Sequence, residues 1–215
     1  MIENADKRAA TFRKLTSKIG VVSAASLQLT QELRPNHSGW IPPSRMVECV
    51  CTGSSVGGQS LVELLLAKNL KNGSFAAFVD LANGFDLDSL SLGLEERMLW
   101  VRCQNETQSL KALDLLLRDD NFSLVVADLR SSSKHLRQAP ARSWYRLQRL
   151  SHQREGYCVI LAQEHLSPCM DLSLTLSANH RFATLNQGRT NIQQTIAQQI
   201  AEQLDSPVTT IAEAI

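Results

Sequence analysis

Hydrophobic positions along the chain alternate between short continuous runs and longer stretches in which they recur with helical spacing. Short apolar runs are typical of buried strands, and recurrence every three or four residues is typical of amphipathic helices. The runs predict strands at 46–51, 75–79, 99–103, 124–127 and 158–162, with an alternating strand nearer an edge at 172–176 and a further strand at 182–185. The helical spacing predicts helices at 4–19, 60–69, 107–118, 144–153 and 191–204.

Strands that alternate with helices in this way favour an α/β fold, in which helices flank both faces of a mainly parallel central sheet. In such a sheet the carboxyl ends of the strands form the functional crevice. We therefore expect a core domain at 46–187, preceded by a helical extension at 1–22 and a linker at 23–45. A C-terminal helix and tail are expected at 188–215.

Composition narrows the class of protein. The chain has 215 residues, of which 43% are hydrophobic and 20% charged, with a net charge of +1. These values exclude a wholly disordered chain and a protein that coats nucleic acid by bulk charge. No apolar run is long enough to cross a bilayer, and the first residues are polar, so we expect a cytoplasmic protein without a membrane partner. Five cysteines without a C-x-x-C pair favour reduced, buried thiols over a zinc site.

The turn after the first core strand reads GSSVGGQS and precedes a helix, as a phosphate-binding P-loop does. Gly53, Gly58 and Ser60 match the pattern G-x-x-x-x-G-K-[ST], and Gly57 adds a further glycine. Gln59 stands where the pattern has lysine. Backbone N–H groups at the helix N-terminus can still form an anion nest. Without the lysine, however, nucleotide affinity should fall at least about tenfold. A simple strand-to-helix turn is the alternative interpretation.

Together with the strands that follow, this loop resembles the RecA recombinase core, over roughly residues 40–185. The strand FVD ends at Asp80, the strand LVVAD at Asp128 and the strand ILAQ at Gln163. By this resemblance, Asp128 is similar to the Walker B carboxylate and Gln163 to the switch glutamine of the family. Ala82 stands where the family has its catalytic glutamate.

The chain is more similar still to ImuA-like accessory proteins, RecA relatives that are encoded beside a Y-family-like polymerase and induced by DNA damage. The similar stretches are LWVRC at 99–103, LLLR at 115–118, FSLVV at 122–126 and SWYRLQRL at 143–150. The resemblance implies a RecA-like fold and a role in the SOS response, translesion synthesis and mutagenesis. The partners it implies are a polymerase-like protein of the ImuB type and RecA.

The replacements at Gln59 and Ala82 argue against catalysis, because an ATPase needs both a charge clamp and a group that orients the attacking water. We therefore expect a non-catalytic adaptor that recruits or regulates an error-prone polymerase, with no catalytic residue, no metal site and no cofactor. Weak binding of ATP and Mg²⁺ stays open, since Asp128 either holds Mg²⁺ weakly or satisfies backbone donors. Two alternatives also stay open: a RecA-like ATPase with an atypical loop, and a modulator of RecA filaments.

Residues 130–154 hold seven Lys and Arg and no acid, and they follow the Walker B-like strand, where RecA has its first DNA-binding loop. Trp144 and Tyr145 are placed to stack on bases. The alternative is a solvated helix face whose arginines lie over the core, with Trp144 packed inside. The candidate DNA-phosphate contacts are Arg130, Lys134, Arg137, Arg142, Arg146 and Arg149.

The two end helices are candidate partner surfaces. In RecA an N-terminal helix docks on the neighbouring subunit, and the helix at 4–19 is similarly placed, so it is expected to bind a second copy, to bind RecA or to pack on its own core. The C-terminal helix has a thin apolar stripe that either binds a partner or docks on the core. The candidate contacts are Phe12, Leu15 and Ile19 in the first helix, and Ile196, Ile200 and Leu204 in the last.

Overall fold

The computed structural model describes residues 41–53, 57–70, 74–88, 90, 93–177 and 189–205. All of these residues belong to one compact unit, Pro35–Ile215. The predicted helix at 4–19, with its partner contacts Phe12, Leu15 and Ile19, lies outside the described residues, as does the predicted strand at 182–185.

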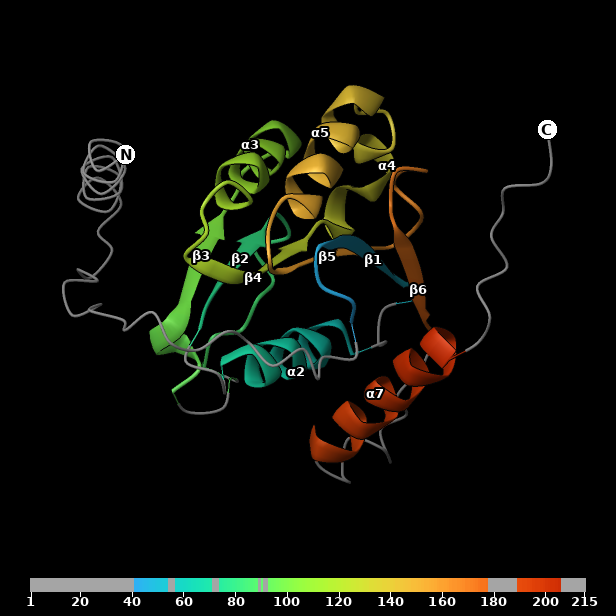
Figure 1. The fold of residues 1–215 in the computed structure, drawn as a ribbon. Helices are drawn as coiled ribbons and strands as arrows, with labels where there is room; N and C mark the ends of the chain where they lie inside the picture. The colour runs from blue at the N-terminus through green and yellow to red at the C-terminus, as the bar shows by residue number, and fades with distance from the viewer. Residues whose placement is uncertain are drawn as a thin grey trace. The chain divides into compact units, whose positions relative to one another are not determined.

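The described residues form one sheet of six parallel strands in the order β3-β2-β4-β5-β1-β6 (Figure 1). The strands are β1 Arg45–Cys51, β2 Phe75–Asp80, β3 Met98–Arg102, β4 Phe122–Asp128, β5 Tyr157–Ala162 and β6 Leu172–Leu176. Within this order β5 separates β1 from β4. The predicted α/β fold is confirmed, and its arrangement is consistent with that of a RecA-like core.

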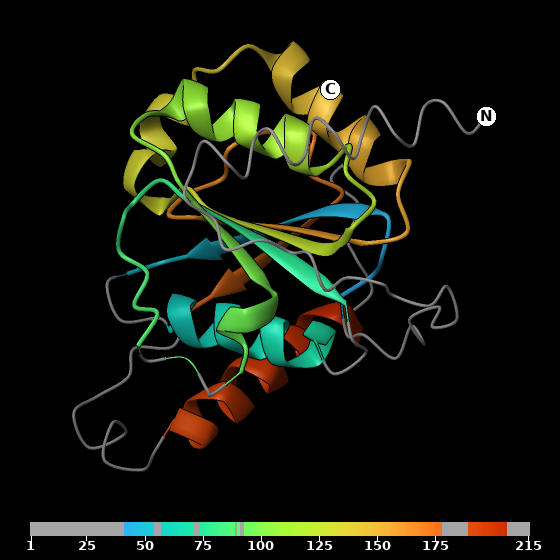
Figure 2. The same ribbon diagram turned by 90° about the vertical axis from the view of Figure 1, so that its left-hand side faces the viewer.

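Helices cover both faces of the sheet (Figure 2). On one face lie α2 Gly58–Leu70 and α7 Arg189–Asp205; on the other lie α3 Glu106–Leu116, α4 Ser133–Leu136 and α5 Ala141–His152. Short 3-10 turns, η1 Glu95–Arg97 and η2 Arg130–Ser132, precede β3 and α4. The sheet therefore separates two hydrophobic cores.

Strand β4 shows how one strand supplies both cores. Successive side chains of a strand point to opposite faces. Leu124 and Val126 accordingly belong to the core beneath α2 and α7, whereas Val125 and Ala127 belong to the core beneath α3 and α5. Because helices cover both faces, the strand reads as an unbroken apolar run in the sequence.

Helix α7 docks on its own sheet. Ile196 and Ile200 are fully buried against the core that contains α2 and β6, and Leu204 is partly buried against the same core. Fully burying such an aliphatic side chain stabilises a fold by about 1.5–3 kcal/mol. Of the two alternatives left open for the isoleucine stripe, the structure shows docking on the chain's own core, and Ile196 and Ile200 are not accessible to a partner.

All five cysteines are free and buried, as the sequence predicts. Burial raises the pKa of the Cys51 thiol to about 11 and that of Cys158 to about 12. Both thiols are therefore protonated at neutral pH and chemically quiet. Among the described helices, none has the length and apolar character that crossing a membrane requires.

Candidate functional site

The carboxyl ends of the parallel strands β1, β2 and β4 lie at the same edge of the sheet, where the turn after β1 leads into α2. Asp80 ends β2 and Asp128 ends β4, and the two are register partners on adjacent strands. Gly53 and Gly57 at the ends of the turn have φ angles of 118° and 79°. Since side chains rarely tolerate such φ values, the backbone of this turn requires glycine at both positions. The fold thus places a phosphate-loop-like turn opposite two strand-end carboxylates.

An internal ion pair holds the Asp128 carboxylate. Arg130 Nε donates to Oδ1 at 2.8 Å and Nη2 donates to Oδ2 at 2.5 Å, while the Arg130 backbone N–H donates to Oδ1 at 3.2 Å. The Asp128 side chain is only 4% exposed. The hydrogen bonds with Asp128 raise the pKa of Arg130 although partial burial opposes its charge. Both oxygens of the Walker B-like carboxylate are therefore occupied by one guanidinium.

The same guanidinium lies against the first residue of α2. A Cβ atom built on Gly58 would collide with Nη1 of Arg130 and come within 2.9 Å of its Cζ. Glycine at this position therefore makes room for the guanidinium at the helix N-terminus, which is where phosphate-loop proteins receive an anion. A side chain from the end of β4 thus brings positive charge to a loop that lacks its own lysine.

Gln59 is held by the loop that follows β2. Its Nε2 donates to the carbonyl oxygen of Asp86 at 2.8 Å, and the Asp86 backbone N–H donates to its Oε1 at 3.4 Å. The amino group and the carbonyl oxygen of the Gln59 side chain are thus both bonded to the backbone of Asp86. The residue that replaces the P-loop lysine fastens α2 to the 81–88 loop. Ser60 follows in the first turn of α2.

Asp80 is fully buried beside this site. Its Oδ2 accepts hydrogen bonds from the Phe85 backbone N–H at 3.4 Å and from Trp100 Nε1 at 3.3 Å. Its Oδ1 is buried and has no hydrogen-bond partner within the described part of the chain. An unpaired buried oxygen is costly unless nearby positive charge compensates it. The Arg130 guanidinium, which is bonded to Asp128, also interacts electrostatically with Asp80, and this is the smallest of the contributions that raise the pKa of Arg130.

Ala82 and Gln163 stand at the positions where the resemblance places the catalytic glutamate and the switch glutamine of the RecA family. Ala82 is exposed in the turn after β2, and its methyl group cannot orient a water molecule. Gln163 is exposed at the end of β5, where its backbone N–H donates to Ser133 Oγ at 3.0 Å. This bond links the end of β5 to the start of α4. The site therefore unites Gly58, Asp128 and Arg130, with Gln163 at the end of the adjacent strand.

The structure divides the predicted DNA-contacting cations into two groups. Arg130 is paired with Asp128 at the carboxyl end of β4. The others are exposed on α4, its C-cap or α5: Lys134, Arg137, Arg142, Arg146 and Arg149. Trp144 is 1% exposed and packs inside, so the prediction that it stacks on a base is wrong, whereas Tyr145 is 59% exposed.

The sequence interpretation missed the ion pair between Asp128 and Arg130. The available signal was the spacing: an arginine two residues after a strand-end aspartate, within a tight 3-10 turn, can fold back onto the carboxylate. No group of three or more His, Cys, Asp or Glu side chains suited to a metal ion occurs among the residues that the structure describes.

A scan against protein-family models found no match, and a search of curated proteins found no similar sequence. The RecA-like and ImuA-like resemblance therefore rests on the residues and motifs quoted above.

Proposed function

We propose that the chain is a non-catalytic RecA-like adaptor in DNA damage tolerance, with a role similar to that of ImuA-like proteins. Such an adaptor helps to bring an error-prone polymerase complex to damaged DNA by binding rather than by turnover. The observation that carries the non-catalytic part is the bidentate pair between Arg130 and Asp128 at the mouth of the loop. The role in DNA damage tolerance rests on the resemblance of 99–103, 115–118 and 143–150.

The ion pair opposes nucleotide binding in two ways. A Mg²⁺ ion that used Asp128 would first have to displace Arg130 from both carboxylate oxygens. Hydrogen bonds to charged groups are each worth about 1.5–3 kcal/mol, so the displacement of two is a substantial cost. The guanidinium also fills space next to Gly58 that a phosphate group would need. Ala82 stands where the resemblance places the catalytic glutamate, and its methyl group cannot orient an attacking water.

One observation favours a second candidate function, an ATPase with an atypical loop. Arg130 places a cation at the N-terminus of α2, where the missing P-loop lysine would act. In that reading Arg130 leaves Asp128 when a nucleotide arrives and binds its phosphates. The two proposals differ in a measurable way, because only the ATPase releases phosphate.

The test is phosphate release from Mg²⁺-ATP by the purified full-length chain, with and without single-stranded DNA. The adaptor proposal predicts no release above that of an Asp128→Asn variant, whose stability is checked by thermal melting. Release that single-stranded DNA stimulates and that Asp128→Asn abolishes would overturn the non-catalytic part.

The adaptor part is tested by binding to a purified Y-family-like polymerase protein from the same organism. Deleting all of α7 would uncover the core around Ile196, so the matched truncations are 1–22 and 206–215, which leave the described elements intact. The proposal predicts that the full chain binds and that one truncation weakens binding. Absence of binding by the full chain would contradict it.

A further inference from the structure

Some cations on the outer side of the α3–α5 layer are already neutralised. Asp114 on α3 accepts hydrogen bonds from Arg146 Nε at 2.5 Å and from Arg118 Nε at 3.0 Å. Arg137 Nη1 donates to Glu164 at 2.9 Å. These three arginines therefore serve contacts within the fold.

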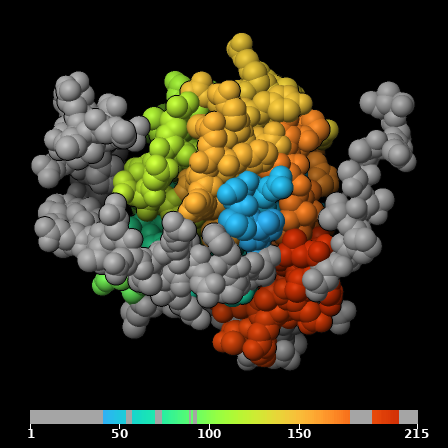
Figure 3. Space-filling model, in the orientation of Figure 1, coloured from blue at the N-terminus to red at the C-terminus, as the bar shows by residue number. Residues whose placement is uncertain are grey.

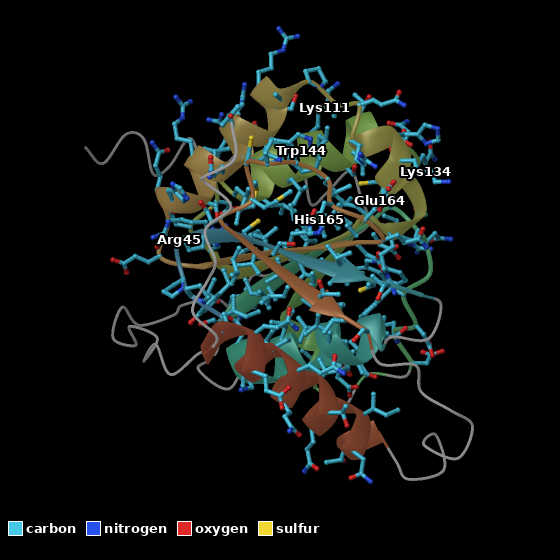
Figure 4. The ribbon with its side chains drawn as sticks, turned by 90° about the vertical axis from the view of Figure 1, so that its right-hand side faces the viewer. Arg45, Lys111, Lys134, Trp144, Glu164 and His165 are labelled. Atoms are coloured by element: carbon cyan, nitrogen blue, oxygen red, sulfur yellow. The ribbon has the colours of Figure 1, made fainter. Side chains whose placement is uncertain are left out.

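Other cations of this layer have no such partner. Among the described residues, no acidic side chain lies within ion-pair distance of the remaining exposed Lys and Arg on these helices. These cations are Lys111 on α3, Lys134 on α4, and Arg142 and Arg149 on α5. Figure 4 shows Lys111 and Lys134 in the helical layer above the sheet, on the same side of the sheet as Trp144. Positive charge thus remains exposed on this layer.

An exposed aromatic ring lies between the two unpaired arginines of α5. Arg142, Tyr145 and Arg149 follow at intervals of three and four residues, so they share one face of the helix, opposite the buried Trp144 and Leu147. At 1.5 Å per residue, the arginines are about 10 Å apart along the axis. Tyr145 is 59% exposed, so most of its ring faces solvent.

Helix α5 is held to its neighbours on both sides. One side is fastened to α3 by the Arg146–Asp114 pair, and the other to the segment before β6, because Gln148 Nε2 and His152 Nε2 both bind Asp171 at 2.8 Å. In the space-filling view the atoms of α5 lie on the outer surface (Figure 3).

We propose that the Arg142–Tyr145–Arg149 stripe, supported by Lys111 and Lys134, binds single-stranded DNA. The cations contact phosphates of the strand and Tyr145 stacks on an unpaired base. Exposed cations that follow the backbone, combined with an aromatic platform, are the general means of binding single strands. A duplex keeps its bases stacked and would leave Tyr145 without a base. This inference rests on the proposed function for its choice of DNA as the anionic partner.

The test is fluorescence anisotropy with a labelled oligo-dT strand and the full-length protein, over about 50–200 mM salt. The double variant Arg142→Ala/Arg149→Ala should weaken binding by about tenfold or more. It should also make the salt dependence shallower by about 1.4 in log–log slope, at about 0.7 per lost phosphate contact. The matched control is Lys68→Ala/Arg97→Ala, which removes the same charge from α2 and η1 and should leave binding unchanged.

Substitutions at Tyr145 separate stacking from charge. Tyr145→Ala should weaken binding by about 5- to 150-fold, which corresponds to 1–3 kcal/mol for the loss of one stacked base. Tyr145→Phe keeps the ring and should bind like the wild type. Equal binding of duplex and single strand with no effect of Tyr145→Ala would overturn the proposal.

Two further outcomes would also overturn it. One is the absence of salt-sensitive DNA binding by the wild type. The other is tighter binding of polyglutamate than of oligo-dT with the same sensitivity to Arg142→Ala/Arg149→Ala, which would assign the surface to an acidic protein. If the chain fails to bind DNA but still captures the polymerase protein and releases no phosphate, this inference fails and the proposed function stands.

Discussion

Arg130 and Arg149 come from the same basic segment, but the structure uses their charges in opposite ways. Arg130 folds back onto the buried Asp128 carboxylate at the carboxyl end of β4. Arg149 is exposed on α5, and the described residues offer it no acidic partner. The acids that decide between these fates, Asp128, Asp114 and Glu164, all lie outside the basic segment. A run of cations therefore stays exposed and unpaired only where folding brings no carboxylate to it.

The largest expected effect comes from removing the crevice cation. Arg130→Ala removes the guanidinium from the buried Asp128 carboxylate, so the free energy of unfolding should fall by about 3–5 kcal/mol. Urea denaturation of the purified chain measures it. The double variant Arg130→Met/Asp128→Leu removes both ions of the pair and should recover part of the loss. A loss below about 1 kcal/mol for Arg130→Ala would mean that the Arg130–Asp128 pair stabilises the fold no more than an exposed ion pair does. Arg130 would then not differ from the exposed arginines of α5 in its contribution to stability.

The next effect concerns the contact between Arg130 and the first residue of α2. Gly58→Ala should destabilise the wild type by about 1–3 kcal/mol, because the new methyl group collides with the guanidinium. In an Arg130→Ala background the collision is absent, and alanine favours the helix by up to about 1 kcal/mol. A double-mutant cycle checks whether the sign of the effect reverses. Equal losses in both backgrounds would contradict this placement of Arg130.

A smaller effect on stability is expected at Asp171, which holds α5 to the segment before β6. Burial opposes ionisation of Asp171, but hydrogen bonds from the Met46 backbone N–H, His152 and Gln148 outweigh it and lower the pKa of Asp171. Because the folded pKa lies below the unfolded value of about 3.9, this stabilisation is present above that pH. It is lost as the pH falls through the folded pKa. Thermal melts from neutral to acid pH should show a shallower loss for Asp171→Asn.

The smallest effect is expected on the outer face of α5. Arg142→Ala and Arg149→Ala should change the free energy of unfolding by no more than about 0.5 kcal/mol, because both side chains are exposed and the described residues provide them with no acid. The same denaturation assay compares them with Arg130→Ala. A loss comparable to that of Arg130→Ala would show that these arginines support the fold.

Much of the fold is predictable from the pattern of apolar positions, because both faces of the sheet are covered. Helix boundaries are less predictable. The helix predicted at 144–153 begins at Ala141, directly after Pro140, whose fixed φ angle suits a helix start. The short elements η1, η2 and α4 were not predicted, because an element of three or four residues is too short to show a hydrophobic periodicity.

The candidate site is predictable only in part. The turn from Gly53 to Ser60 and the strand-end Asp128 follow from local motifs, since each belongs to a strand and its adjacent turn. The position of Arg130 against Gly58 depends on how β4 and β1 are spaced in the sheet, with β5 between them. That spacing is a tertiary property. For the same reason, the burial of Trp144 and the exposure of Tyr145 become clear only once α5 is placed on the sheet.

The most direct measurement is isothermal titration of Mg²⁺-ATP into the wild type and into Arg130→Ala, with folding of both checked by circular dichroism. The account predicts no saturable binding to the wild type up to about 1 mM nucleotide, because Arg130 occupies both the Asp128 carboxylate and the space at Gly58. Micromolar binding to the wild type that Arg130→Ala abolishes would contradict it, since Arg130 would then act as a phosphate ligand.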